Sequence, residues 1–286
     1  MGLDINAALL LMDARAKGAS FKRVLMLGRL SLNVYAARMA ALLAERGLPN
    51  DAFLKTSSEG GYAEPFFHAL GAEVVDTMDA SDFEGAKLVH DLNQPLPDKW
   101  KGAYDVVMDG GTLEHVFHFP TALKNAMELV KEGGRLVIHT PVNNLCGHGF
   151  YQFSPELFYR ALNPQNGYEV ERMIMHRVGP YGKWLEVSDP EKIRERVELI
   201  TFTPMHLLVQ ARRTKIVPIF ATPPQQSDYS AMWQEAAPAA ATPPPAPKRV
   251  LFPRLARLIH VARTGLEFYR RQSLGNRRFF KPVKKG

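Results

Sequence analysis

The sequence contains almost no cysteine and no long hydrophobic run. Cys146 is the single cysteine among 286 residues, which excludes a disulfide framework and suits a reducing cytoplasm. The apolar run of residues 7–12 is too short to cross a bilayer, and it lacks the basic segment that a secretion signal needs. No internal repeat is visible. A hydrophobic content of 46% is ordinary for a chain that buries a full core, so we predict a cytoplasmic globular protein.

Acidic residues are nearly absent from the C-terminal part of the chain. Residues 248–286 contain twelve Lys and Arg but one acid, Glu267, which gives them a net charge of +11. The whole chain carries +7, so residues 1–247 carry −4. An asymmetry of this size predicts a C-terminal segment that contacts a polyanion, either a membrane surface or a nucleic acid.

Composition divides the chain into three segments. A length of 286 residues allows one large domain with appendages, since a domain takes roughly 150 residues. We predict an α/β domain over residues 1–221 that begins with a helix over residues 4–17. Residues 222–247 are rich in Ala and Pro and predict an extended linker. In the basic tail, residues 248–286, a stripe of Leu and Ile predicts an amphipathic helix over residues 253–272.

Short apolar strands alternate with helical patterns along the domain. Strand, turn and helix in succession indicate βαβ units, whose crossovers are right-handed and whose strands form a parallel sheet. A later β-rich pair suits a closing antiparallel hairpin. The predicted strands are 23–28, 72–78, 86–90, 104–108 and 135–140, the hairpin strands are 168–178 and 205–212, and the helices are 35–45 (capped by Ser31 or Asn33), 63–70, 121–131 and one that begins at Ser154.

Four stretches at the strand ends, in this order and spacing, resemble class I S-adenosylmethionine-dependent methyltransferases, most closely the bacterial small-molecule and glycan enzymes. The stretches are His90–Pro97, Tyr104–Val107, Leu113–Val116 and Leu129–Asn143, and the resemblance covers about residues 20–212. It implies a Rossmann-like class I methyltransferase fold with a mostly parallel sheet and an antiparallel closing hairpin, to which the basic tail adds a C-terminal helix. It also implies S-adenosylmethionine as cofactor and methyl transfer as the reaction.

The resemblance assigns cofactor contacts to the carboxyl ends of two strands. Asp79 matches the acid that hydrogen-bonds the ribose hydroxyls, and a carboxylate is a good acceptor for a vicinal diol. Asp91 and Leu92 match the residues that hold the adenine amine and ring. The alternatives are equally open, because Asp79 with Asp82 could cap a turn and Asp91 could form an Asx-turn.

The loop after the first strand departs from the resemblance. A glycine-rich turn is expected there, because glycine lets the backbone approach the cofactor closely. Here Gly28 is followed by Arg29 and Leu30, which put bulk beside the amino-acid end of the cofactor. Three outcomes are open: Arg29 meets the cofactor carboxylate, the cofactor binds weakly, or it does not bind. Asp109 and Gly110, at the end of a neighbouring strand, complete the predicted cofactor residues, and the pair Gly110 and Gly111 would leave room for the cofactor.

Two histidines are candidate general bases for a hydroxyl acceptor, because a base near neutral pKa helps to remove its proton. His148 lies between two glycines in the loop after strand 135–140, where a substrate would approach. His115 begins the helix after strand 104–108 and could equally be a packing residue. Both could also join a metal site with Glu114 and His118, but their spacing matches no zinc motif, so we predict no metal. The aromatic residues nearby fit a substrate pocket or core packing: Phe117, Phe119, Phe150, Tyr151 and Phe153.

The basic tail has several interpretations. A basic amphipathic helix can lie on an anionic membrane and bring the enzyme to lipid-linked substrates at the inner face. It can instead dock on the domain or on a partner protein, or stay solvated. Binding to nucleic acid is the weakest interpretation, since it depends on base stacking by Phe279 and Phe280.

Two functions are consistent with the sequence. The first is a methyltransferase that acts on a hydroxyl of a sugar or other small metabolite, in surface-polysaccharide biosynthesis. The second is a catalytically inactive scaffold or binding protein at the membrane that keeps the fold but has lost the cofactor. The loop of residues 28–33 distinguishes them, because it decides whether the cofactor can bind.

Overall fold

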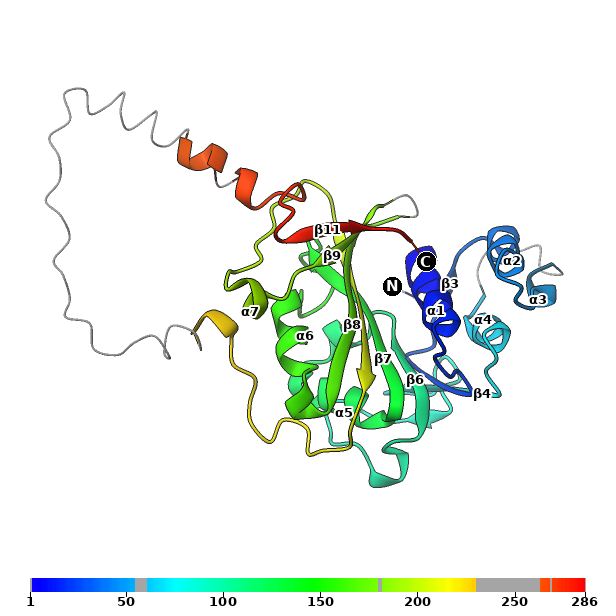
Figure 1. Cartoon of the computed structure of the whole chain (residues 1–286). Coiled ribbons are helices and arrows are strands. Elements are labelled where there is room, and N and C mark those ends of the chain that lie inside the picture. The colour runs from blue at the N-terminus through cyan, green and yellow to red at the C-terminus, as the bar shows by residue number, and fades with distance from the viewer. Residues whose placement is uncertain (1, 55–60, 180–181, 230–262, 268, 286) are drawn as a thin grey trace, which may run out of the picture.

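The computed structural model describes residues 2–54, 61–179, 182–229, 263–267 and 269–285 (Figure 1). Most of the predicted linker and most of the predicted helix over residues 253–272 lie outside these residues. Within them, no helix is both long enough and apolar enough to cross a membrane.

A single mixed sheet of nine strands forms the centre of the described structure, in the order β11-β9-β8-β10-β7-β6-β2-β4-β5 (Figure 1). Neighbours from β5 to β7 are parallel, and β10 then runs antiparallel between β7 and β8. This confirms the predicted Rossmann-like sheet with its antiparallel closing pair. The bounds are β2 (Arg23–Leu27), β4 (Val74–Asp79), β5 (Leu88–Val89), β6 (Tyr104–Asp109), β7 (Val130–Asn143), β8 (Tyr168–Arg177), β9 (Trp184–Val187), β10 (Met205–Arg213) and β11 (Phe280–Val283).

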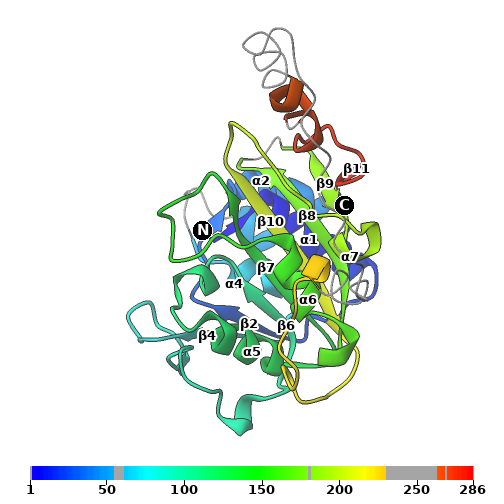
Figure 2. The same ribbon diagram turned by 90° about the vertical axis from the view of Figure 1, so that its left-hand side faces the viewer.

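Helices cover both faces of the sheet, as Figures 1 and 2 show. Along β2, Val24 and Met26 face one hydrophobic core while Leu25 and Leu27 face the other, as expected of a strand buried on both sides. The first core contains α1 (Ile5–Ala16), α2 (Ala36–Ala44) and α4 (Glu64–Ala69), and the second contains α5 (Phe119–Leu129) and α6 (Pro155–Ala161). The short helices α3 (Asp51–Leu54) and α7 (Pro190–Ile193) lie in connections.

The N-terminal segment lies across the edge of the sheet. Asp4 caps α1, since its carboxylate accepts hydrogen bonds from the Asn6 and Ala7 amides at 2.9 Å. Strand β1 (Leu3–Asp4) pairs in parallel with β3 (Leu32–Asn33), and the Gly2 amide donates to the Gly110 carbonyl at 2.8 Å. The predicted capping of the next helix by Ser31 or Asn33 is therefore wrong, because these residues belong to or flank β3 and α2 begins at Ala36.

Two further local predictions fail for reasons of packing. Strand β7 begins five residues before the predicted strand 135–140, so Gly133 and Gly134 lie within it, and a Cβ on Gly134 would lie 2.8 Å from the Asp105 carbonyl oxygen. At the other end of the chain, β11 adds an unpredicted edge strand beside β9. Phe279 and Phe280 are 1% and 0% exposed, so their predicted role in base stacking is wrong and they belong to the core.

Candidate functional site

The carboxyl ends of four neighbouring strands meet at one edge of the sheet, where α/β proteins bind ligands. In the register, Leu27 lies between Met78 of β4 and Asp109 of β6, and Asp109 pairs with Ile138 of β7. The residues that follow these positions are therefore brought together, although they are far apart in the sequence. They include most of the residues predicted to bind the cofactor.

Gly28 closes β2 in a conformation that requires glycine. Its φ is +71°, and a Cβ at this position would lie 2.9 Å from Thr112 Oγ1 and 3.9 Å from Asp79 Oδ2. The Thr112 hydroxyl in turn donates to the Leu27 carbonyl at 2.7 Å. Gly28 thus keeps the space between the two neighbouring strand ends open.

Asp79 ends β4 directly beside Gly28. Its carboxylate is half-buried, and Oδ1 accepts a hydrogen bond from the Ala80 amide at 2.6 Å. The second oxygen, Oδ2, lies toward Gly28 and has no partner among the described residues. Asp79 therefore caps its turn and still presents an acceptor to the space above Gly28, so its role in cofactor binding stays a prediction.

Asp91 and Leu92 differ from each other in what they can offer a ligand. Asp91 is exposed and forms the Asx-turn that was the alternative, since it accepts from the Asn93 amide at 2.9 Å and from the Asn93 side chain at 2.7 Å. These hydrogen bonds hold the pKa of Asp91 below its ordinary value. Leu92 is 5% exposed and packs in the core, so the role of its backbone and side chain in holding the adenine ring stays a prediction.

Arg29 and Leu30 are both engaged within the protein. Arg29 Nε lies 2.7 Å from Glu64 Oε1, and its guanidinium stacks on Tyr62, 3.8 Å from the ring centroid. The outcome in which Arg29 meets the cofactor carboxylate is therefore not supported. Leu30 is 4% exposed and fills the room beside Gly110, which contradicts the prediction that Gly110 leaves space for the cofactor.

Asp109 is fully buried and acts within the protein. Its Oδ1 accepts hydrogen bonds from the amides of Thr112 at 2.9 Å and Leu113 at 3.3 Å, which start a short 3-10 helix over Leu113–His115. Burial, with the nearby Glu114 carboxylate, raises the pKa of Asp109 to about 8. Asp109 is 0% exposed here, which gives no support to its predicted contact with the cofactor, so that role stays a prediction.

His148 and His115, the two predicted bases, come together over Glu114, and their catalytic role stays a prediction. Their ring centroids are 5.3 Å apart, and His148 Nε2 lies 3.6 Å from Glu114 Oε1. Glu114 is fully buried and accepts from the Thr140 hydroxyl at 3.2 Å. Burial raises the pKa of Glu114 and lowers that of both histidines, so neutral imidazole bases are favoured. His118 does not join this group, whose three members could hold a metal ion.

The aromatic residues around His148 divide between the two predicted roles. Phe119 and Phe153 are buried with ring centroids 4.3 Å apart, so they belong to the core. Phe117 and Phe150 are 63% and 68% exposed, with centroids 5.9 Å apart, and the Tyr151 hydroxyl donates to the Phe117 carbonyl. The exposed pair offers apolar surface beside His148.

A second cluster was missed by sequence analysis. Asp4, His139, His176 and His206 lie together on the α1 side of the sheet. Burial lowers the pKa of His139 to about 4 and that of His206 to about 3, and it also lowers that of His176. The three histidines fall within predicted strands, so their burial could have been expected. Nothing in the sequence indicated that Asp4, over 130 residues away, would join them.

Comparisons with known proteins concern the fold. No family model and no curated protein matches the chain. One similar structure is the 1,6-didemethyltoxoflavin-N1-methyltransferase of Burkholderia thailandensis, solved with 1,6-didemethyltoxoflavin and S-adenosylhomocysteine. It is 14% identical, with a TM-score of 0.39, and the match covers 74% of this chain and 80% of that one. The YcgJ protein of Bacillus subtilis is 13% identical with a TM-score of 0.39, over 73% and 99%.

A branched-chain polyamine synthase from Thermus thermophilus, solved with N4-aminopropylspermidine and 5'-methylthioadenosine, is 15% identical with a TM-score of 0.38. The match covers 74% of this chain and 56% of the synthase, so the chain spans about half the length of that protein. Likeness at this level says nothing about activity or ligands. The assignment of the fold therefore depends on the strand order described above.

Proposed function

We propose that this protein is an S-adenosylmethionine-dependent methyltransferase that acts on a hydroxyl of a sugar or other small metabolite. The observation that carries the proposal is the pairing of Gly28 and Asp79 at adjacent strand ends. A glycine with φ +71° leaves the backbone accessible, and the free Asp79 Oδ2 lies beside it. A nucleoside whose ribose lies over Gly28 would find its hydroxyls next to that carboxylate oxygen.

The residues at the opposite side of this edge supply a base. His148 lies in the loop after β7, and the buried Glu114, whose Oε1 lies 3.6 Å from His148 Nε2, would orient the imidazole that accepts the proton. S-adenosylmethionine would supply the methyl group, while His148 would hold the proton of the acceptor hydroxyl. The exposed Phe117 and Phe150 would pack against an apolar face of the acceptor.

A second function, a non-catalytic scaffold, is favoured by one specific observation. Leu30 fills the room beside Gly110, and the Gly2 amide is bonded to the Gly110 carbonyl. The ribose end of the cofactor would meet Gly28 and Asp79, whereas its amino-acid end would require Leu30 to move. A protein whose Leu30 stays in place would keep the fold without the cofactor.

Calorimetric titration with S-adenosylmethionine and S-adenosylhomocysteine distinguishes the two functions. We expect binding, and we expect Asp79→Asn to weaken it at least tenfold by removing a charged acceptor for the ribose. Asp82→Asn, three residues further on and exposed, is the matched control and should bind like the wild type. If neither compound produces heat of binding or a thermal shift, the methyltransferase proposal is overturned and the scaffold function remains.

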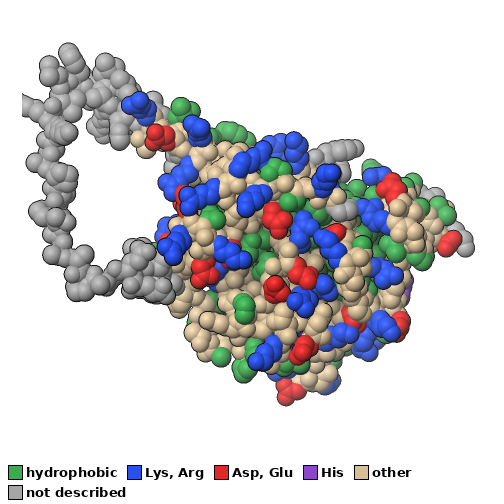
Figure 3. Space-filling view, in the orientation of Figure 1, with side chains coloured by type: hydrophobic (Ala, Val, Ile, Leu, Met, Phe, Trp, Pro, Cys, Tyr) green, Lys and Arg blue, Asp and Glu red, His purple; other side chains and the backbone are tan. Residues whose placement is uncertain are grey.

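The basic tail extends the proposal to an anionic membrane surface at the inner face of the cytoplasmic membrane. Lys and Arg side chains gather over the upper part of the face in Figure 3, where β11 and β9 lie. Co-sedimentation with anionic vesicles tests this, using a full-length variant with Arg263→Gln and Arg270→Gln, since both side chains are exposed. Reduced pelleting is expected, and equal pelleting of variant and wild type would reject the membrane. Retaining residues 276–285 matters, because their deletion would remove β11 from the core.

A further inference from the structure

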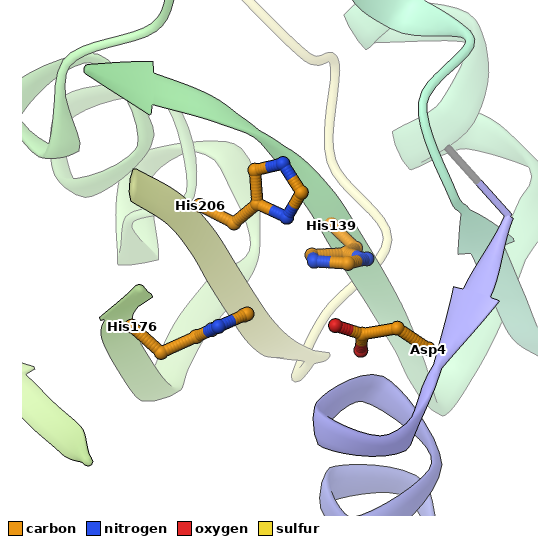
Figure 4. Close-up of side chains that lie close together, drawn as sticks. All are labelled: Asp4, His139, His176 and His206. Atoms are coloured by element: carbon orange, nitrogen blue, oxygen red, sulfur yellow. The ribbon is translucent and has the colours of Figure 1, made fainter. Parts of the chain in front are cut away.

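The second cluster has the composition of a metal site. Three imidazoles and one carboxylate converge from four elements, and one ligand atom from each lies within 4.8 Å of all the others. Figure 4 shows the Asp4 carboxylate pointing from the start of α1 toward the three rings. A tetrahedral zinc site with bonds of about 2.0–2.1 Å needs donor atoms roughly 3.3 Å apart, so binding an ion would draw these side chains closer together.

The register of the sheet places the three histidines on one face. His206 of β10 pairs directly with His176 of β8, and His139 of β7 pairs with Leu208, two residues along β10 from His206. Side chains two residues apart on a strand share a face. That face is the one covered by α1, so Asp4 at the start of α1 reaches all three rings.

Ring nitrogens of the cluster are buried without partners. His139 is 1% exposed, His176 is 0% exposed and His206 is 9% exposed. Among the described residues, no hydrogen bond reaches Nε2 of His176 or Nδ1 of His206, and the His139 ring has no partner other than the backbone of Gly2. Core histidines are normally hydrogen-bonded, because an unpaired buried polar group is costly. Each of the three rings therefore has at least one unpaired nitrogen within the cluster, which indicates a ligand that accepts lone pairs.

Neighbouring groups orient these side chains as outer-shell partners orient metal ligands. His176 Nδ1 lies 2.8 Å from the Arg177 carbonyl, which fixes its proton on Nδ1 and leaves the Nε2 lone pair for a ligand. The Asn6 amide donates to Asp4 Oδ2 at 3.2 Å. Asn6 is itself held by Trp184 Nε1 at 3.0 Å and by Lys285 Nζ at 2.9 Å.

We infer that Asp4, His139, His176 and His206 bind one divalent transition-metal ion, with zinc as the best match. Neutral imidazole and carboxylate suit zinc, and four protein ligands form a closed site of the structural kind. The ion would fasten the N-terminal strand β1 to β7, β8 and β10. It would thereby fix the segment whose Gly2 amide covers Gly110. This inference does not depend on methyl transfer.

Metal analysis of the full chain, followed by Co²⁺ titration of chelator-treated protein, tests the site. We expect one equivalent of metal, a visible absorption band of four-coordinate Co²⁺, and a higher melting temperature with Zn²⁺. His139→Ala and His176→Ala should each weaken binding more than about 100-fold, beyond the 10- to 100-fold that loss of an outer-shell partner costs. Asn6→Ala should fall within that smaller range.

Two further variants separate loss of metal from loss of fold. Asp4→Asn keeps an efficient helix cap, so it should keep the apo melting temperature while losing the rise produced by Zn²⁺. The double variant His115→Ala with His148→Ala removes the two histidines beside Glu114 and should keep the Co²⁺ band. A band that survives in Asp4→Asn and His139→Ala, a band lost in the double variant, or the absence of any band in the wild type would each overturn the inference.

Discussion

Leu30 occupies the space into which a side chain on Gly110 would project. A Cβ on Gly110 would lie 2.7 Å from Leu30 Cδ2, closer than real contacts allow. Gly110 does not have a positive φ, so alanine is strained there by packing alone. This contact decides how much room the edge of the sheet offers a ligand.

We therefore expect Gly110→Ala to lower the free energy of unfolding by about 1–3 kcal/mol, as overpacking of a core does. Adding Leu30→Ala should recover part of this loss, so that the double variant is more stable than the sum of the single changes predicts. Urea unfolding measures each value. Gly61→Ala, which meets no atom within 4 Å, is the control, and purely additive effects would show that the two residues do not touch.

Leu30→Ala should also increase the affinity for S-adenosylhomocysteine, because it frees the space needed by the amino-acid end of the cofactor. The measurement is the calorimetric Kd of the variant against the wild type. Leu10→Ala, which removes the same atoms from a fully buried position in α1, controls for loss of stability. An unchanged Kd in both variants would mean that Leu30 does not limit binding.

The burial of Asp109 predicts how stability depends on pH. Its pKa in the folded state, about 8, lies above the ordinary value of 3.8, so the folded protein binds the extra proton. The stabilising contribution is fully present below about pH 4 and is lost as the pH rises toward 8. Asp109→Asn keeps the oxygen that accepts from Thr112 but cannot ionise. It should be more stable than the wild type at pH 8 by at least about 1 kcal/mol, since a pKa raised by one is worth about 1.4 kcal/mol.

Thermal unfolding of wild type and Asp109→Asn from pH 5 to 8 provides the measurement. The difference in melting temperature between Asp109→Asn and the wild type should grow as the pH rises. Asp98→Asn, whose carboxylate is 94% exposed, should show no such trend. A constant difference between wild type and Asp109→Asn across this range would contradict the raised pKa.

His148 should govern the rate of methyl transfer more than the binding of the cofactor. We expect His148→Gln to lower kcat by about 10²- to 10⁴-fold, the usual contribution of a general base, with little change in the Kd of S-adenosylmethionine. The assay follows labelled methyl groups into a panel of small hydroxyl acceptors. His118→Gln, three residues beyond His115 and outside the cluster, should keep its rate. Equal kcat values for His148→Gln and His118→Gln would show that His148 is not the general base.

The end of the chain should contribute to stability as part of the core. Phe280→Ala is expected to cost about 3–5 kcal/mol, because the side chain is fully buried between the sheet and its neighbours. Leu266→Ala, at a side chain 72% exposed, should change stability by less than about 0.5 kcal/mol. Urea unfolding of both variants provides the comparison, and similar small losses would show that β11 is not part of the folded unit.

The sequence predicts the fold where local pattern and packing agree. The apolar runs of β2, β4, β6, β8 and β10 and the cap at Asp4 specify their elements directly. Strand β11 could not be predicted, because Phe280 pairs with Val187 through a contact made only in the folded chain. Burial likewise decides which candidates remain in the site. Asp109 and Asp79 both end a strand in the sequence, yet Asp109 is buried and bonded to the Thr112 amide, whereas Asp79 Oδ2 lies toward Gly28.

The contact between Asn6 and Lys285 joins residues separated by 279 positions. Loop-closure entropy makes so distant a contact slow to form and dependent on the rest of the sheet being in place. During synthesis, α1 and β2 emerge early, but the residues that complete their packing are made much later. Asn6, Trp184 and Lys285 therefore complete their network only after residue 285 has left the ribosome. The order of translation thus makes this junction a late step in folding, and its closure reports that the whole sheet has been assembled.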